Sequence, residues 1–151
     1  MSFVIKSTSD KKQMHLNIVV YGAFKVGKTS LAKTVKNPLV ISIENGMLCL
    51  AGSDIDYIDC PTYTSVKELV SAIKANKDGQ FDKYDWLVLD QLTELAQNMY
   101  PPLRDKMVRE AVANGSKGAD GRQVWTKFAE LIGGIVKDIR ALPMHTCILA
   151  Q

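Results

Sequence analysis

Cysteine and histidine are scarce in this chain, and those present form no pattern. The 151 residues include three cysteines, Cys49, Cys60 and Cys147, and two histidines. No two cysteines form a C-x-x-C pair, and no histidine lies at metal-ligand spacing from them. A disulfide framework and a cysteine–histidine zinc site are therefore excluded. We expect reduced, mostly buried thiols in a cytoplasmic protein, or in the host cytoplasm if a phage encodes it.

Long apolar runs and a strong excess of one charge are also missing. No stretch approaches the ~20 apolar residues that would span a bilayer, and residues 1–12 lack the apolar core of a signal peptide. The net charge of +3 is too small to argue for nucleic acid by itself. The length indicates one domain. We expect a polar N-terminal arm at residues 1–13 and a single core at residues 14–151.

One short segment, residues 22–29, matches the G-x-x-x-x-G-K-[ST] pattern of the phosphate-binding P-loop. An apolar, β-branched run at residues 16–21 precedes it and predicts a buried strand. Residues 30–36 predict a helix. A strand that leads through this loop into a helix is the setting in which the motif has meaning. The sequence therefore predicts a nucleotide-phosphate site.

Each type of residue in the loop has a physical role in holding phosphates. Free backbone N–H groups at a helix N-terminus suit an anion, and glycine permits a tight loop. The lysine would reach the β- and γ-phosphates, and the threonine hydroxyl would bind Mg²⁺. The predicted nucleotide-binding residues are Gly22, Ala23, Phe24, Lys25, Val26, Gly27, Lys28, Thr29 and Ser30. We expect ATP and Mg²⁺ as cofactors.

The remaining pattern alternates strands with helices, which predicts an α/β fold: a three-layer P-loop NTPase with a mostly parallel sheet. Two features of the helices carry specific expectations. Pro101 and Pro102 should break the helix that begins near Leu92, and Gly133-Gly134 should allow close packing. Further strands are expected at residues 39–43, 56–60, 84–90 and 145–150, and helices at residues 64–73, 92–112 and 124–142, with a loop at residues 113–121.

Polar residues follow several of the predicted strands, where ligands bind in parallel sheets. Asp90 closes an apolar strand and would hold Mg²⁺, although it could also cap the next helix. Glu44 is the candidate for polarising the attacking water, because Gln91 follows Asp90 and cannot accept a proton as a glutamate does; the alternative is a surface carboxylate. Gln151 could sense the γ-phosphate or be a functionless end.

The order of these motifs resembles the phage-encoded RecA-like P-loop ATPases, some of which act as single-strand annealing recombinases. The resemblance covers nearly the whole chain. It is carried by the P-loop, by Ile43-Glu44-Asn45-Gly46, by Leu89-Asp90-Gln91-Leu92-Thr93 and by Cys147-Ile148-Leu149-Ala150-Gln151.

The resemblance implies further properties. The strand before Gln151 should lie between the P-loop strand and the Asp90 strand, Glu44 should activate water, and Lys28 and Gln151 should act at the γ-phosphate. The resemblance also implies that the protein forms a homo-oligomer and binds single-stranded DNA, and that it does not associate with a membrane. Gln91 departs from the serine usual in the group, and the group continues past residue 151, which implies a C-terminally truncated core.

Some roles stay open at this level. Arg104, Arg109, Arg122 and Arg140 are the arginines, and any of them could be a finger or a solvated charge. DNA phosphates could contact Lys106, Arg109, Lys117 and Arg122, although no interleaved aromatics mark a stacking platform.

The leading functional hypothesis is a Mg²⁺-dependent ATPase of RecA type that acts in phage DNA recombination or single-strand annealing. The alternative is a nucleotide-binding DNA or assembly module without turnover. A small GTPase is less favoured, because Asn76-Lys77-Asp78-Gly79 has the wrong spacing for guanine recognition. A nucleotide or small-molecule kinase is also less favoured, because residues 113–121 contain no arginine for a lid.

Overall fold

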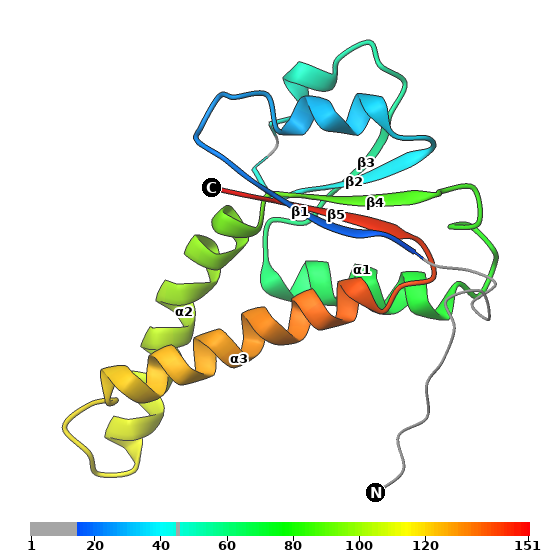
Figure 1. Cartoon of the computed structure of the whole chain (residues 1–151). Coiled ribbons are helices and arrows are strands. Elements are labelled where there is room, and N and C mark those ends of the chain that lie inside the picture. Colours follow the sequence, from blue (N-terminus) through cyan, green and yellow to red (C-terminus); the bar gives the residue numbers. More distant parts are fainter. Residues whose placement is uncertain (1–14, 45) are drawn as a thin grey trace, which may run out of the picture.

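The sheet contains five strands in the order β1-β5-β4-β2-β3, and Figure 1 shows their arrangement. The computed structural model describes residues 15–44 and 46–151, so the expected polar N-terminal segment at residues 1–13 lies outside the described part. All neighbouring strands are parallel, so their carboxyl ends meet at one edge. The strands are β1 (Asn17–Tyr21), β2 (Pro38–Ser42), β3 (Asp56–Asp59), β4 (Trp86–Asp90) and β5 (His145–Ala150).

The order of the strands confirms the expectation for β5, which pairs with β1 on one side and with β4 on the other. The pairing of β2 with β4 places Ser42 directly beside Asp90. The P-loop segment and Asp90 therefore leave the sheet at the same edge, separated by the single strand β5.

Helices cover both faces of the sheet and complete three layers (Figure 1). The two short 3₁₀ helices lie on one face, and α1 and α3 lie on the other, where α2 also begins. None of the described helices is long and apolar enough to cross a membrane. The helices are η2 (Thr29–Thr34), η3 (Met47–Leu50), α1 (Tyr63–Ala75), α2 (Leu92–Ala113) and α3 (Gly121–Arg140).

Two apolar clusters, one on each face, hold the layers together. Along β2, Leu39 and Ile41 pack with the α-helices, whereas Val40 packs on the opposite face with η2 and η3. All three side chains are buried, as expected for a parallel strand that is covered on both sides. The continuous apolar runs of β2 and β4 therefore reflect burial on both faces. The predicted burial of the first strand is wrong, because β1 lies at the edge of the sheet and most of its side chains are exposed.

The helix after the P-loop is shorter than predicted. The sequence favours a helix over residues 30–36, but η2 ends at Thr34. Asn37 adopts a positive φ of 45°, and Pro38 disfavours the helical region for the residue before it. The chain therefore leaves the helix early and enters β2.

The predicted break at Pro101 and Pro102 is wrong, because α2 runs through both prolines. Each proline removes a backbone hydrogen bond to the carbonyl four residues earlier, here those of Gln97 and Asn98. These two residues are exposed, so water can satisfy their carbonyls. Buried Met99 holds this part of the helix to the core.

The expectation that Gly133-Gly134 permits close packing is also wrong. A Cβ atom added at either glycine would meet nothing within 4 Å. The two glycines therefore lower the helix propensity of α3 without making room for a neighbour.

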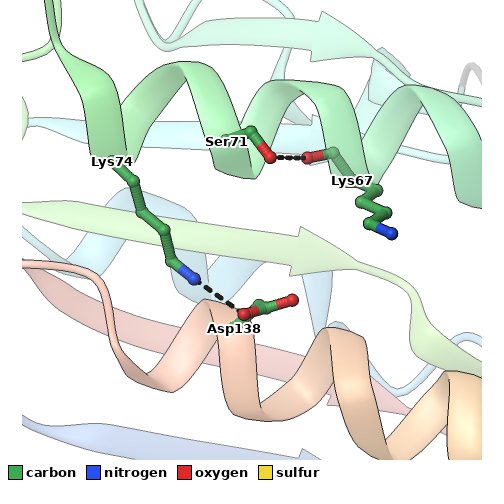
Figure 2. Close-up of polar contacts among 4 residues, drawn as sticks. All are labelled: Lys67, Ser71, Lys74 and Asp138. Atoms are coloured by element: carbon green, nitrogen blue, oxygen red, sulfur yellow. Dashed lines mark hydrogen bonds and ion pairs between the residues drawn. The ribbon is translucent and has the colours of Figure 1, made fainter.

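An ion pair joins α1 to α3, which lie on the same face of the sheet. Lys74 Nζ lies 2.7 Å from Asp138 Oδ1 (Figure 2). In α1 the Ser71 hydroxyl donates to the Lys67 carbonyl at 2.8 Å, within the helix (Figure 2). Both side chains of the ion pair are partly exposed, at 38% and 46%, so apolar contacts, not this pair, dominate the packing of the two helices.

Candidate functional site

A cavity of about 390 Å³ opens at the carboxyl edge of the sheet. It lies where the P-loop, the end of β2 and the end of β4 meet. Of the predicted residues, Gly22, Ala23, Val26 and Gln151 are not part of its lining. The lining consists of Phe24, Lys25, Gly27, Lys28, Thr29, Ser30, Glu44, Gly46, Met47, Cys49, Asp90 and Gln91.

One of the two glycines of the loop has a backbone conformation that requires glycine. Gly27 has a φ of +88°, in the region that side chains disfavour. The Gly22 N–H donates to the Ala150 carbonyl at 3.3 Å. The loop is therefore anchored to β5 at its start and turns tightly at its end.

Lys28 places its ammonium group at the inner side of the loop. Its Nζ donates to the Gly22 carbonyl at 2.7 Å and to the Ala23 carbonyl at 2.8 Å. Lys28 is half-buried and lines the cavity. A positive charge is thus fixed where the loop wraps, which suits an anionic group in the cavity.

Thr29 and Asp90, the two predicted metal ligands, meet in the structure. The Thr29 hydroxyl donates to Asp90 Oδ2 at 2.6 Å, across 61 residues of sequence. Oxygen donors of this kind, one hydroxyl and one carboxylate, fit Mg²⁺, which takes one or two protein ligands and otherwise water and phosphate oxygens. The donor set therefore suits the expected ion.

The alternative role of Asp90 as a helix cap is not supported. Gln91 is the N-cap residue of α2 and makes no side-chain capping bond. Burial raises the pKa of the Asp90 carboxyl, and the Thr29 hydrogen bond and the Lys28 charge partly offset this rise. A carboxylate that has lost water in this way gains from a nearby cation.

Glu44 is exposed and lines the cavity beside the end of β4. Desolvation raises the pKa of its carboxyl, and a hydrogen bond with Glu94 and the negative charges of Glu94 and Asp90 raise it further. A raised pKa brings a carboxylate closer to the range in which a general base works. The role of Glu44 as the base and the alternative of a surface carboxylate both stay predictions.

Glu94 was not among the predicted site residues. It lies in the first turn of α2, where Gln91 Nε2 donates to Glu94 Oε1 at 3.5 Å, and it raises the pKa of the Glu44 carboxyl. The sequence contained one signal: Glu94 follows Asp90 by four residues, in a helix that begins at the strand end. That signal was ambiguous, because the same spacing also suits a helix cap.

Gln151 is exposed at the end of β5, outside the cavity lining. The Thr93 hydroxyl accepts from the Gln151 N–H at 2.8 Å and donates to the Gln151 carbonyl at 3.1 Å. The backbone of Gln151 is therefore tied to the first turn of α2. Its predicted role at the γ-phosphate stays a prediction.

The three cysteines are free, and two of them are buried, as expected. Cys60 and Cys147 lie in the core, whereas Cys49 is exposed and lines the cavity. Cys49 thus places an exposed thiol at the site.

The predicted phosphate-contacting cations lie on the distal parts of α2 and α3 and on their connection, which we call the arm (residues 100–128). Figure 1 shows these helices extending beyond the sheet. Lys106 pairs with Glu110 at 3.8 Å. Within the described part of the chain, Arg109, Lys117 and Arg122 form no ion pair.

The arm also carries an aromatic cluster that the sequence did not reveal. Tyr100 and Trp125 have ring centroids 4.9 Å apart, and Phe128 lies 5.4 Å from each. Trp125 is 58% exposed. Sequence spacing concealed this group, because Tyr100 comes from α2 and the other two rings from α3.

Comparison with known proteins gives a family for this site and fold. The SPbeta prophage-derived uncharacterized protein YorG of Bacillus subtilis (strain 168) is 22% identical over 121 residues, which cover 77% of this chain. The chain spans 37% of the length of that relative. A family model described as "AAA domain" matches residues 14–151, nearly the whole chain. The chain belongs to this AAA domain family.

Proposed function

We propose that this chain is the nucleotide-binding core of a Mg²⁺-dependent ATPase of RecA type. The main support for the proposal is the 2.6 Å hydrogen bond between the Thr29 hydroxyl and the Asp90 carboxylate, which joins the P-loop to the end of β4 at the cavity. A hydroxyl and a carboxylate on a metal, beside a P-loop lysine, are the parts that phosphoryl transfer needs. A cytoplasmic homo-oligomer is part of this proposal.

In the proposed reaction, a water oxygen forms a bond to the γ-phosphorus of ATP, and the bond from that phosphorus to the β–γ bridging oxygen breaks. Glu44 takes the proton of the attacking water, and Lys28 balances the charge on the β- and γ-phosphates. Thr29 and Asp90 would hold Mg²⁺, which neutralises charge on the transferred group when bound. The N–H groups of residues 22–30 would hold the phosphate tail.

A nucleotide titration of the purified chain tests the proposal. ATP with Mg²⁺ should bind, and Lys28→Ala should abolish measurable affinity, because the charge that faces the phosphates is lost. Lys33→Ala is the matched control, since Lys33 is an exposed lysine of η2 outside the cavity lining and its loss should change affinity little. Equal affinities for wild type and Lys28→Ala would refute the nucleotide site.

Hydrolysis distinguishes an ATPase from a binding module without turnover. Glu44→Gln should retain ATP binding and lose turnover, because an amide cannot accept the proton of water. Phosphate release that continues in Glu44→Gln would assign the base to another group. If wild type binds ATP without releasing phosphate, the module without turnover becomes the better description.

Guanine recognition is disfavoured by the position of Asn76-Lys77-Asp78-Gly79. Asn76 is the C-cap of α1, and the segment leads into the start of β4. It therefore lies at the amino edge of the sheet, opposite the cavity. Asn76 also bonds within its own turn, through Nδ2 to Asp82 Oδ1 at 2.6 Å. We expect ATP to bind more tightly than GTP in the titration.

We propose DNA recombination or single-strand annealing in a phage as the setting. Two observations support this setting. One relative of the chain is prophage-derived. In the arm, Trp125 is exposed near cations that form no ion pair within the described residues. Exposed aromatic rings stack on bases, and cations contact the backbone of single strands. The arm is therefore the proposed contact for single-stranded DNA.

A further inference from the structure

Ser42 carries a buried hydroxyl that no other described residue satisfies. The residue is 1% exposed, and its Oγ has no hydrogen-bond partner within the described part of the chain. Buried polar groups nearly always have a partner, so each exception needs an explanation. An alanine at this position would avoid the cost of the unsatisfied hydroxyl.

The position of Ser42 in the sheet indicates what the hydroxyl serves. Ser42 is paired in register with Asp90 on β4, and register partners in a parallel sheet point to the same face. Two residues earlier on each strand, Val40 and Val88 share the cluster beneath η2 and η3. The Ser42 side chain therefore faces the P-loop side, next to the carboxylate that Thr29 contacts.

We propose that Ser42 is a positioning residue of the magnesium site, and that its hydroxyl orients the Asp90 carboxylate by hydrogen bonding when Mg²⁺ and ATP are bound. The proposal rests on the proposed function. Among the described residues, Thr29 is the hydrogen-bond partner of Asp90 Oδ2, which leaves Oδ1 for the neighbouring hydroxyl. Residues that orient metal ligands are themselves important for metal affinity.

Two other residues of the sheet serve as controls. Thr146 is also 1% exposed, but its hydroxyl donates to Asn17 Oδ1 at 2.7 Å, at the amino edge of the sheet. Asp59 is the other register neighbour of Ser42, on β3, and it is exposed. Thr146→Val tests the loss of a satisfied buried hydroxyl, and Asp59→Asn tests the loss of a neighbouring charge away from the P-loop.

The experiment measures fold stability, which should not fall in the variant, and magnesium affinity, which should weaken. In Ser42→Ala, the melting temperature without metal or nucleotide should stay level or rise, by at most about 4 °C. The Mg²⁺ concentration for half-maximal ATP binding should rise about tenfold. Thr146→Val should lower the melting temperature and leave the Mg²⁺ requirement unchanged. Asp59→Asn should also leave the Mg²⁺ requirement unchanged.

The proposal has outcomes that would overturn it. An unchanged Mg²⁺ requirement in Ser42→Ala, while Asp90→Asn raises it, would show that the hydroxyl does not serve the metal. A metal-free melting temperature that falls as far as that of Thr146→Val would show that the hydroxyl is structural. If the wild-type chain binds no ATP, the proposed function itself fails, and the Ser42 role fails with it.

Discussion

At the scale of single residues, the candidate site depends on charges that have lost part of their water. The carboxyl groups of Asp90 and Glu44 both have raised pKa values, each with desolvation as the first cause. Such shifts cluster at functional sites, because a bound cation or a proton transfer makes use of them. The chemistry is therefore sensitive to small changes of charge near these two groups.

Glu94→Gln should alter the pH dependence of hydrolysis. Glu94 raises the pKa of Glu44 through a hydrogen bond and through its negative charge, so removing that charge should lower the pKa of Glu44. The base must be ionised to act, and the acid limb of the pH–rate profile should therefore move to lower pH. The measurement is kcat for ATP hydrolysis over a pH series that spans the acid limb of the profile.

The same pKa shift has a stability consequence with a defined sign. The folded pKa of Glu44 is raised above its unfolded value, so the folded state binds the proton more tightly. The stability from this group is present at low pH and is lost as pH rises through the folded pKa. Glu94→Gln should reduce that loss. An acid limb that does not move in Glu94→Gln would contradict the coupling of the two carboxyl groups.

Cys49 should report nucleotide binding by its reactivity. It is the exposed cysteine and lines the cavity, whereas Cys60 and Cys147 are buried. ATP at ten times its Kd should slow maleimide labelling of Cys49 about tenfold, because only the free protein exposes the thiol. Labelling is followed by mass spectrometry, and Lys28→Ala is the control, in which ATP should give no protection. Equal rates with and without ATP in wild type would place the nucleotide elsewhere.

At the scale of elements, the helices are held by apolar faces more than by their own propensity. α3 contains two adjacent glycines in its interior and still extends over 20 residues, because buried Ile135 and Ile139 pack in the core beneath the sheet. The Lys74–Asp138 pair adds a partly exposed contact to α1 (Figure 2). The position of α3 therefore depends on burial.

Gly133→Ala should stabilise the protein. A Cβ at this position meets nothing within 4 Å, and alanine favours a helix interior over glycine by about 1 kcal/mol. The melting temperature should rise by about 2–4 °C. The matched control is Ile135→Ala, two residues away in the core, which should cost about 2–5 kcal/mol. A lower melting temperature for Gly133→Ala would mean that α3 has a close neighbour at this point.

At the scale of the whole molecule, the two proposed functional surfaces lie on different parts of one fold. The cavity forms at the carboxyl edge, where strand ends distant in sequence converge. The arm is an extension of α2 and α3 beyond the sheet (Figure 1). Since α2 begins directly after Asp90, the two surfaces share one continuous element.

Binding of single-stranded DNA should depend on the arm in two separable ways. Trp125→Ala should lower affinity at all salt concentrations, since stacking contributes about 1–3 kcal/mol per base. Arg122→Ala should reduce the slope of log affinity against log salt by about 0.7 if it contacts one phosphate. Fluorescence anisotropy over a salt series measures both. Lys36→Ala, a change of an exposed cation outside the arm, is the control, and an affinity independent of salt would exclude the arm as a phosphate-binding surface.

The sequence by itself determined the P-loop, the strands and the sheet class, because these depend on local patterns. The sequence shows a G-x-x-x-x-G-K-T segment after an apolar run, and apolar runs that are followed by Glu44 or end in Asp90. These patterns can be recognised without knowing any tertiary contact. The order of β5 between β1 and β4 was anticipated through the resemblance and is what the structure shows.

Only the tertiary structure decided which distant side chains meet. The bond between Thr29 and Asp90, the effect of Glu94 on the pKa of Glu44 and the register of Ser42 with Asp90 each join residues from different elements. The continuity of α2 through Pro101 and Pro102 likewise depended on exposure of the freed carbonyls. Burial, exposure and cross-strand register are properties of the packed sheet, and local sequence patterns do not contain them.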